Sequence, residues 1–211
     1  MNYNDQILEN KAFNFFKQLM YNIALSICVV LIGVLAMVYG FGFKLYEVMS
    51  GSEEPYLPVG CMAVVKAKDE YKVGDILTFR LGATTVTHRL IATYEKNGTT
   101  YYLCHGDNNE SANPLSDKDK APWEEDSKYV QDLLDAHDGN YSAVKHLIRD
   151  TQDVPKADVI GSVVNHIDNL GTIITFIKGH YLLVIAIIAG IWCVSNMLQN
   201  EIEMKKARRL L

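Results

Sequence analysis

The chain has 211 residues, about the size of one ordinary domain with short extensions, so a single core is expected. Hydrophobic residues make up 49% of it and charged residues only 21%, and the apolar residues concentrate in two blocks near the ends. The net charge of -5 excludes a broad basic surface for phosphate backbones, so we expect no nucleic acid partner.

The first apolar block, residues 18–43, lies between Lys17 and Lys44 and contains no Asp, Glu, Lys, Arg or His. About 20 residues of helix cross the hydrocarbon core of a bilayer, and this block exceeds that length. The apolar part of a cleaved signal peptide is only about 7–15 residues long. The sequence therefore predicts a transmembrane helix over 18–43, preceded by a cytoplasmic segment over 1–17.

The second apolar block, residues 180–200, has the same character and predicts a second transmembrane helix. Four basic residues follow it in the tail 201–211, and Lys11 and Lys17 precede the first block. Because positive charge accumulates on the cytoplasmic side, both termini are expected in the cytoplasm. The prediction is a multi-pass protein of the cell membrane whose residues 44–178 lie outside the cytoplasm.

The region between the two blocks is predicted to be mainly β, as an antiparallel barrel or folded sheet. Short runs rich in Val, Ile, Thr, Leu and Tyr alternate with polar or glycine-containing turns. Asn97-Gly98 separates two of these runs, and this pair suits the positive φ angles of a tight hairpin. The expected strands are 62–66, 75–80, 84–93, 100–105 and 159–167.

Residues 114–155 differ in composition and pattern from the β-rich residues before them. Asp and Glu outnumber Lys and Arg here, and apolar residues recur at helical spacing. Helices are expected over 127–137 and 141–149, which makes this segment an acidic helical insertion in the β-domain. Such an insertion contacts a substrate or partner, or it is a solvated surface excursion; the sequence leaves both open.

Four motifs occur in order along the chain and carry a resemblance to a known family. They are Ser50-Gly51-Ser52-Glu53-Glu54-Pro55, Thr87-His88-Arg89, Gly106-Asp107-Asn108-Asn109 and Val159-Ile160-Gly161. Together they resemble the type I signal peptidases of the S26 family, in the branch of archaeal, endoplasmic-reticulum and spore-former enzymes that uses histidine as base. The resemblance covers the first apolar block and the β-domain, and the acidic insertion lies outside it.

The chemistry of these residues fits a serine peptidase. A serine hydroxyl is a weak nucleophile at neutral pH and needs a base within hydrogen-bond reach, which predicts Ser52 as nucleophile and His88 as base. An acid that orients the imidazole completes such a system, and Asp107 is the candidate. By resemblance, the Ser52 N–H and the Ser50 hydroxyl form the oxyanion hole.

Two positions depart from the family pattern. Glu53 stands where the family normally has Met, and Asn113 stands where the histidine-using branch has a second Asp. Asn cannot supply a negative charge, so Asp107 acts alone, Asp117 reaches in as a secondary acid, or activity is reduced. An acid at position 53 would alter substrate choice or the seating of the domain on the membrane.

The predicted function is membrane-bound cleavage of signal peptides from exported preproteins, with no metal and no cofactor. The expected partners are membrane-anchored signal peptides and the lipid bilayer, with a further contact through 114–155. One alternative is a degenerate, membrane-tethered family member that binds exported chains without cleaving them. Another is a Ser-Lys peptidase with Lys66 or Lys72 as base, although His88 occupies the position that resembles the base of the family.

Overall fold

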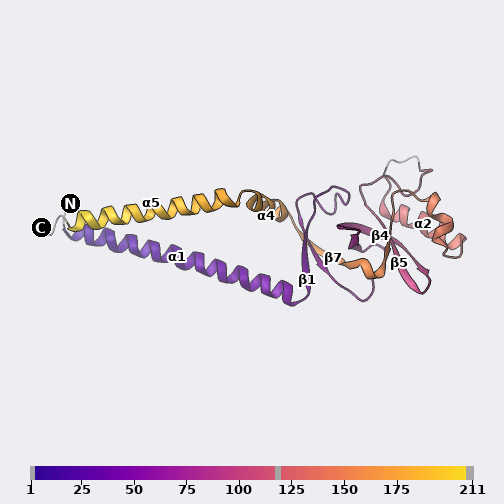
Figure 1. Ribbon diagram of the computed structural model, residues 1–211, viewed down its shortest axis with the longest axis horizontal. Helices are drawn as coiled ribbons and strands as arrows, with labels where there is room; N and C mark the ends of the chain where they lie inside the picture. The colour runs from indigo at the N-terminus through magenta and orange to yellow at the C-terminus, as the bar shows by residue number, and fades with distance from the viewer. Residues whose placement is uncertain (1–2, 117–119, 208–211) are drawn as a thin grey trace.

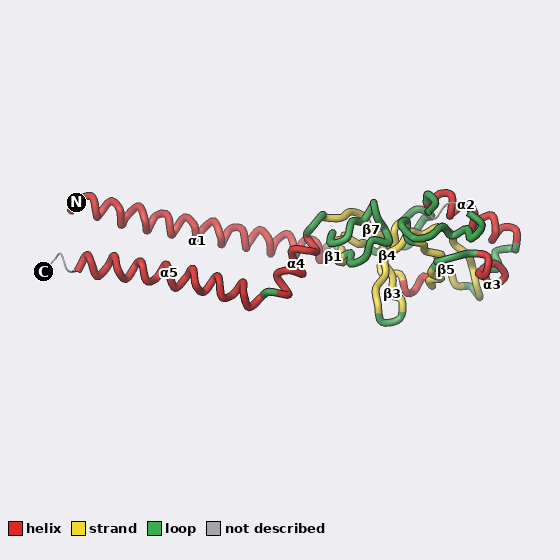
Figure 2. The backbone as a smooth tube through the Cα atoms, turned by 90° about the horizontal axis from the view of Figure 1, so that it is seen from above, coloured by secondary structure: helices red, strands yellow, loops and turns green. Residues whose placement is uncertain are grey.

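The computed structural model describes residues 3–116 and 120–207. A body built around one β-sheet lies at one end of the molecule, and two long helices extend from it (Figure 1). Both views place the beginning of α1 and the end of α5 together at the far end from the sheet (Figure 2).

Helix α1 spans Tyr3–Gly40, and within it Lys17–Gly40, 24 residues, is long and apolar enough to cross a membrane. The helix ends before the predicted limit at residue 43. Gly42 takes a φ of 77° at the turn, and Phe43 already begins β1 (Phe43–Glu47). A glycine is suited to this turn because it adopts positive φ without a steric penalty.

The second apolar block, residues 180–200, lies in α5 (Tyr181–Ala207) apart from His180. Helix α4 (Leu170–Gly179) precedes it, and the two helices are bent by 76° relative to each other. They meet the criterion for a membrane span only as a bent pair, so the predicted second transmembrane helix is not confirmed. Polar contacts hold α4 against the sheet: the Thr175 hydroxyl donates to Glu47 at 2.8 Å, and the Thr172 N–H donates to the Gly60 carbonyl at 3.0 Å.

The described strands form one seven-stranded sheet in the order β1-β2-β7-β3-β4-β5-β6, and every pairing is antiparallel. The mainly β prediction is confirmed, and each of the five expected strands is present. The sheet is not closed, because β1 and β6 are its edges, so a barrel is not confirmed. The strands after β1 are β2 (Met62–Lys66), β3 (Ile76–Leu81), β4 (Thr84–Lys96), β5 (Thr99–His105), β6 (Gln152–Pro155) and β7 (Val159–Ile167).

The β4–β5 hairpin turns at Asn97 and Gly98, with φ angles of 53° and 73°. Both positive values match a type I′ turn, whose twist agrees with that of the flanking strands. Near its other end, the β4–β5 register shifts between Leu90 and Ala92. A bulge of this kind bends a strand and re-aims its side chains, and here it follows His88 and Arg89 directly.

The insertion contributes to the core of the domain. Its elements are α2 (Trp123–Ala136), α3 (Tyr141–Val144), the 3-10 turn η1 (Lys145–Leu147) and strand β6, and the 3-10 turn η2 (Lys156–Asp158) follows it. Val130, Leu134 and Val144 are fully or almost fully buried and pack with β4 and β5 residues. The insertion is therefore only partly helical, since its last residues extend the sheet. A partner contact through it stays a prediction.

Two buried cysteines of the domain, Cys61 and Cys104, are free thiols. Cys104 packs with Leu77, Phe79 and Leu90 on the face of β3, β4 and β5 that does not meet α2. Burial raises the pKa of the Cys104 thiol, so it remains a neutral apolar side chain.

Candidate active site

Ser52 lies in the loop between β1 and β2, and backbone hydrogen bonds close the base of this loop. The Val48 N–H donates to the Cys61 carbonyl at 3.0 Å, and the Gly60 N–H donates to the Val48 carbonyl at 2.8 Å. Asn108 holds the tip: its N–H donates to the Ser52 carbonyl at 2.8 Å and its side-chain amide donates to the Gly51 carbonyl at 2.9 Å. The serine is thus carried on a loop with a fixed backbone.

A glycine at position 106 makes this contact with Asn108 possible. A Cβ added to Gly106 would lie 2.7 Å from the Ser52 carbonyl oxygen, inside the distance that real Cβ atoms keep from backbone atoms. The segment after β5 can therefore approach the serine loop only because residue 106 has no side chain.

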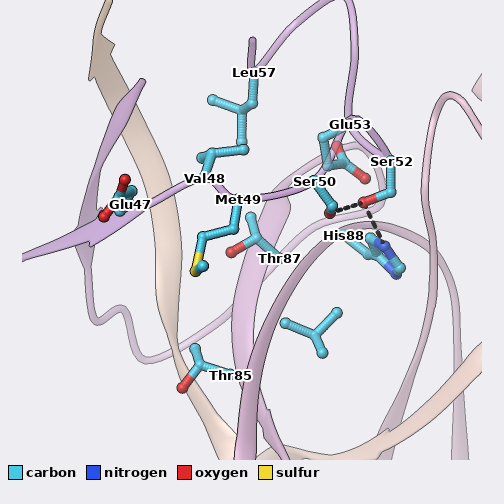
Figure 3. Close-up of a pocket in the computed structure, with 11 residues that line it drawn as sticks. Glu47, Val48, Met49, Ser50, Ser52, Glu53, Leu57, Thr85, Thr87 and His88 are labelled. Carbon is cyan, nitrogen blue, oxygen red and sulfur yellow. Dashed lines mark hydrogen bonds between the residues drawn. The ribbon is translucent and has the colours of Figure 1, made fainter. Parts of the chain in front are cut away.

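His88 projects from β4 to the serine. Its Nε2 lies 3.1 Å from the Ser52 hydroxyl oxygen, and its ring packs edge-on against Phe79. Figure 3 shows the chain of contacts from Ser50 through Ser52 to His88. The side chain of His88 is buried, with only 6% of its surface exposed. The structure therefore brings together the two residues that the sequence proposed as nucleophile and base.

The second ring nitrogen of His88 is occupied by Gln152, the first residue of β6. The side-chain oxygen of Gln152 accepts a hydrogen bond from His88 Nδ1. A proton on Nδ1 leaves the Nε2 lone pair facing the Ser52 hydroxyl, which is the tautomer a general base requires. Gln152 thus orients the imidazole as a triad acid would, but without a negative charge.

The His88 pKa is lowered from its ordinary value, chiefly because burial disfavours the charged ring. The hydrogen bond to Gln152 and the negative charges of Asp150 and Asp107 oppose this effect, and the nearby His105 adds to it. At neutral pH the imidazole is therefore neutral and able to accept a proton.

Asp107, the predicted orienting acid, does not contact His88. Its carboxylate binds the Arg89 guanidinium, with Arg89 Nε 2.8 Å from Oδ1 and Nη2 on Oδ2. Arg89 also donates from Nη1 to the Gly74 carbonyl at 2.8 Å and lies over the ring of Trp123. The structure thus places Asp107 against the buried Arg89, the residue after His88, and among the described residues it makes no hydrogen bond to His88. Its role as orienting acid stays a prediction.

The structure also locates the remaining candidate residues. The hydroxyl oxygens of Ser50 and Ser52 are 3.3 Å apart. Asn113 accepts a hydrogen bond from the Leu115 N–H at 2.9 Å in a local turn and makes no described bond to His88. Asp117 lies outside the described residues.

The two lysines of the Ser-Lys alternative are exposed. The ammonium group of Lys66 lies over the ring of Phe43, 4.9 Å from its centroid. Within the described part of the chain, neither Lys66 nor Lys72 makes a hydrogen bond to Ser52, so the site does not support a lysine base.

A pocket of about 180 Å³ opens beside the serine. Residues 47–50 form one side of it and residues 85–88 of β4 form the other (Figure 3). On β4, residues 84–89 pair with β3, whereas pairing with β5 begins only at Arg89. The edge of β4 from Thr84 to His88 that points away from β3 is therefore unpaired within the described sheet, and it borders the pocket.

Sequence reasoning missed Gln152 and the contribution of Asn108. Asn108 lies inside a motif that the sequence analysis singled out, so the motif itself was the available signal. Gln152 had no such signal, because it is 64 residues from His88 and lies in the segment interpreted as helical insertion.

No family model matches the chain. The chain is 37% identical over 84 residues to the protein named Signal peptidase I W of Bacillus subtilis (strain 168), an alignment that covers 37% of this chain and 44% of that relative. The chain thus spans less than half the length of the curated relative it matches. This similarity, over part of each chain, supports a relationship between this protein and the type I signal peptidases.

Proposed function

We propose that this protein is a membrane-bound serine endopeptidase that cleaves signal peptides from exported preproteins. The observation that carries the proposal is the contact of the Ser52 hydroxyl with Nε2 of His88, 3.1 Å apart, while Gln152 accepts a hydrogen bond from Nδ1. A hydroxyl and an imidazole in this relation form the nucleophile and base of serine acyl transfer. The relationship to the type I signal peptidases supports the same chemistry.

In the proposed reaction, Ser52 attacks the carbonyl carbon of the scissile bond while His88 Nε2 takes the hydroxyl proton. The tetrahedral intermediate collapses to an ester on Ser52, and the imidazolium gives its proton to the leaving amine. Water then attacks the ester, and His88 takes one of its protons. The carboxylic acid product is released as the proton returns to Ser52.

The oxyanion of each intermediate needs fixed donors. We assign this role to the Ser52 N–H and the Ser50 hydroxyl. The Ser50 and Ser52 hydroxyl oxygens are 3.3 Å apart, which is close enough for Ser50 to face an oxygen on the carbon that Ser52 attacks. The backbone of residues 51 and 52 is held by Asn108, so the donors need little rearrangement as charge develops.

The substrate would bind as an extended strand along the unpaired edge of β4 from Thr84 to His88. Backbone groups on such an edge are available for strand addition, with side chains of the bound peptide alternating between pocket and solvent. The pocket of about 180 Å³ would take small side chains before the cut. Strand addition also brings the scissile carbonyl past Ser52, at the end of this edge.

Membrane attachment would place the site near the substrate. The apolar stretch Lys17–Gly40 precedes Ser52 by only a short segment. We propose that α1 spans the membrane, that the apolar block 180–200, almost all of it in α5, spans it a second time, and that both termini are cytoplasmic with residues 44–178 outside. A preprotein held by its signal sequence would then present its cleavage site to this domain.

The test is cleavage of a preprotein by the full chain purified in detergent. Ser52→Ala and His88→Ala should each lower kcat by at least about a thousandfold, as loss of a nucleophile or its base does in serine peptidases. The matched controls Ser142→Ala and His146→Ala change exposed residues of the insertion and should leave kcat unchanged. If wild type and all four variants are equally inert on a panel of preproteins, the protein is a binding member of the family and the proposal is wrong.

A further inference from the structure

Glu53, the residue directly after the nucleophile, is a buried acid with an unusual environment. Only 1% of its surface is exposed, although it follows Ser52 in a surface loop. One carboxyl oxygen, Oε1, accepts a hydrogen bond from the Arg89 N–H at 3.1 Å. The other, Oε2, is buried and has no hydrogen-bond partner among the described residues. Burying a carboxyl oxygen without a hydrogen-bond partner reduces the stability of the fold, so a carboxyl at this position calls for a physical role.

The bond from Glu53 to Arg89 connects the two halves of the candidate site. Ser52 and Glu53 are consecutive on the loop, and His88 and Arg89 are consecutive on β4. The hydrogen bond between the Glu53 side chain and the Arg89 N–H therefore connects the loop that carries Ser52 to the strand that carries His88. Asn108 holds the same loop, but it does so from the segment after β5 and does not reach β4.

We propose that Glu53 is a positioning residue that fixes the Ser52 hydroxyl against His88, because its side-chain oxygen accepts a hydrogen bond from the Arg89 N–H. This inference rests on the proposed peptidase function, because its effect on rate is an effect on that reaction. Reacting groups need close alignment, and a displacement of about 1 Å can cost about a hundredfold in rate.

The surroundings of Glu53 favour its neutral form. Burial raises its pKa to about 9, and the negative charge of Asp107 acts in the same direction, while the charge of Arg89 and the backbone N–H groups of Asp107 and Arg89 act against both. The charge of an ionised Glu53 would also raise the pKa of the buried Cys104 thiol on β5. Because the contribution of burial is the largest, ionisation would leave a poorly hydrated charge inside the loop, and we expect the loop to open to hydrate it. Activity should fall as the pH rises through about 9.

Two substitutions separate the acceptor from the charge. Glu53→Gln keeps a side-chain oxygen for the Arg89 N–H but cannot ionise, whereas Glu53→Met is similar in length and has no oxygen. Glu54→Gln is the matched control, since the neighbouring acid is only partly buried and changes in the same way.

Steady-state cleavage of a preprotein by the full chain in detergent, from pH 6 to 10, is the first measurement. Glu53→Met should lower kcat by about ten- to a hundredfold with KM within about threefold of wild type. Glu53→Gln should keep kcat within about threefold at pH 7.5 and lose the fall near pH 9. Wild-type kcat in Glu53→Met, or an unchanged alkaline fall in Glu53→Gln, would overturn the proposal.

A second measurement does not depend on turnover. Hydrogen exchange at the Arg89 amide, followed by mass spectrometry on a peptide that covers 87–91, reports the hydrogen bond directly. Protection should fall at least tenfold in Glu53→Met and persist in Glu53→Gln and Glu54→Gln, with thermal unfolding confirming that all variants are folded. If exchange follows this pattern while wild type cleaves nothing, the peptidase proposal fails; equal protection in all variants defeats the positioning role.

Discussion

Replacing Gln152 by Glu tests whether the residue on the far side of His88 orients the catalytic base. The Gln152 side-chain oxygen already accepts from His88 Nδ1, and Glu has nearly the same shape, so the geometry should persist. The change adds one negative charge directly beside the imidazole. A Ser-His-carboxylate arrangement would then replace a neutral one.

The magnitude follows from the distance and the burial. Two unit charges about 4 Å apart attract by about 4 kcal/mol at an effective dielectric constant of about 20. Gln152 is only partly buried, and Asp150 and Asp107 already act on His88, so screening reduces the gain. We expect the His88 pKa to rise by about 1 to 2 units, which corresponds to about 1.4 to 2.7 kcal/mol of added stabilisation of the imidazolium.

The assay is kcat/KM for preprotein cleavage from pH 5 to 9. Only neutral His88 acts as base, so a raised pKa moves the acid limb of the profile upward by about 1 to 2 pH units. On the plateau above that limb, the imidazolium formed in the transition state is better stabilised, and kcat should rise by about ten- to a hundredfold. Gln152→Leu should lower kcat, because nothing then fixes the tautomer.

Gln131→Glu adds the same charge on the exposed side of α2 and serves as the control. It should leave both the limb and the plateau unchanged. The reasoning is refuted if Gln152→Glu moves neither feature and Gln152→Leu retains wild-type kcat, because Gln152 would then have no part in orienting the base.

Three other substitutions have defined outcomes. Asn113→Asp should leave kcat within about twofold, because Asn113 bonds the Leu115 N–H rather than His88, and a large gain in the cleavage assay would contradict this placement. Gly106→Ala should lower kcat at least tenfold, since the added Cβ would lie 2.7 Å from the Ser52 carbonyl oxygen. Unaltered kcat would show that the segment after β5 can move away from the serine loop without loss of activity. Asp107→Asn should lower the free energy of unfolding by about 3 to 5 kcal/mol, because it leaves Arg89 without its counter-charge; thermal or denaturant unfolding measures this. A changed pH profile of cleavage without loss of stability would instead support Asp107 as the acid that orients His88.

The strands that the sequence predicted are those with local signals. Runs of β-branched residues marked β2, β3, β4, β5 and β7, and Asn97-Gly98 marked a hairpin. Strand β1 was missed because Phe43 continues the apolar block without interruption. Strand β6 was missed because Gln152-Asp153-Val154-Pro155 has little β-propensity of its own, and its pairing with β5 comes from tertiary structure.

The candidate site divides in the same way. Ser52 and His88 were found because each lies in a short motif, but spacing along the chain cannot tell which neighbour Asp107 faces. His88 and Arg89 are consecutive on β4, and consecutive strand residues point to opposite faces. The Asp107 carboxylate lies on the face of β4 to which the Arg89 side chain points, not on the His88 face. The orienting contact to His88 comes instead from β6, and no local pattern in the sequence encodes that contact.

In the proposed reaction, a neutral residue, Gln152, takes the place of the usual acid beside His88. Arg89 and Asp107 neutralise each other, so the arginine next to His88 in the sequence is a balanced charge. A side-chain oxygen is sufficient to fix the tautomer of His88, whereas a carboxylate would also stabilise the imidazolium. Because Gln152 is held by the pairing of β6 with β5, the insertion that lies outside the family resemblance supplies part of the site. Its packing against the sheet through Val130 and Leu134 thus bears on the geometry of the base as well as on stability.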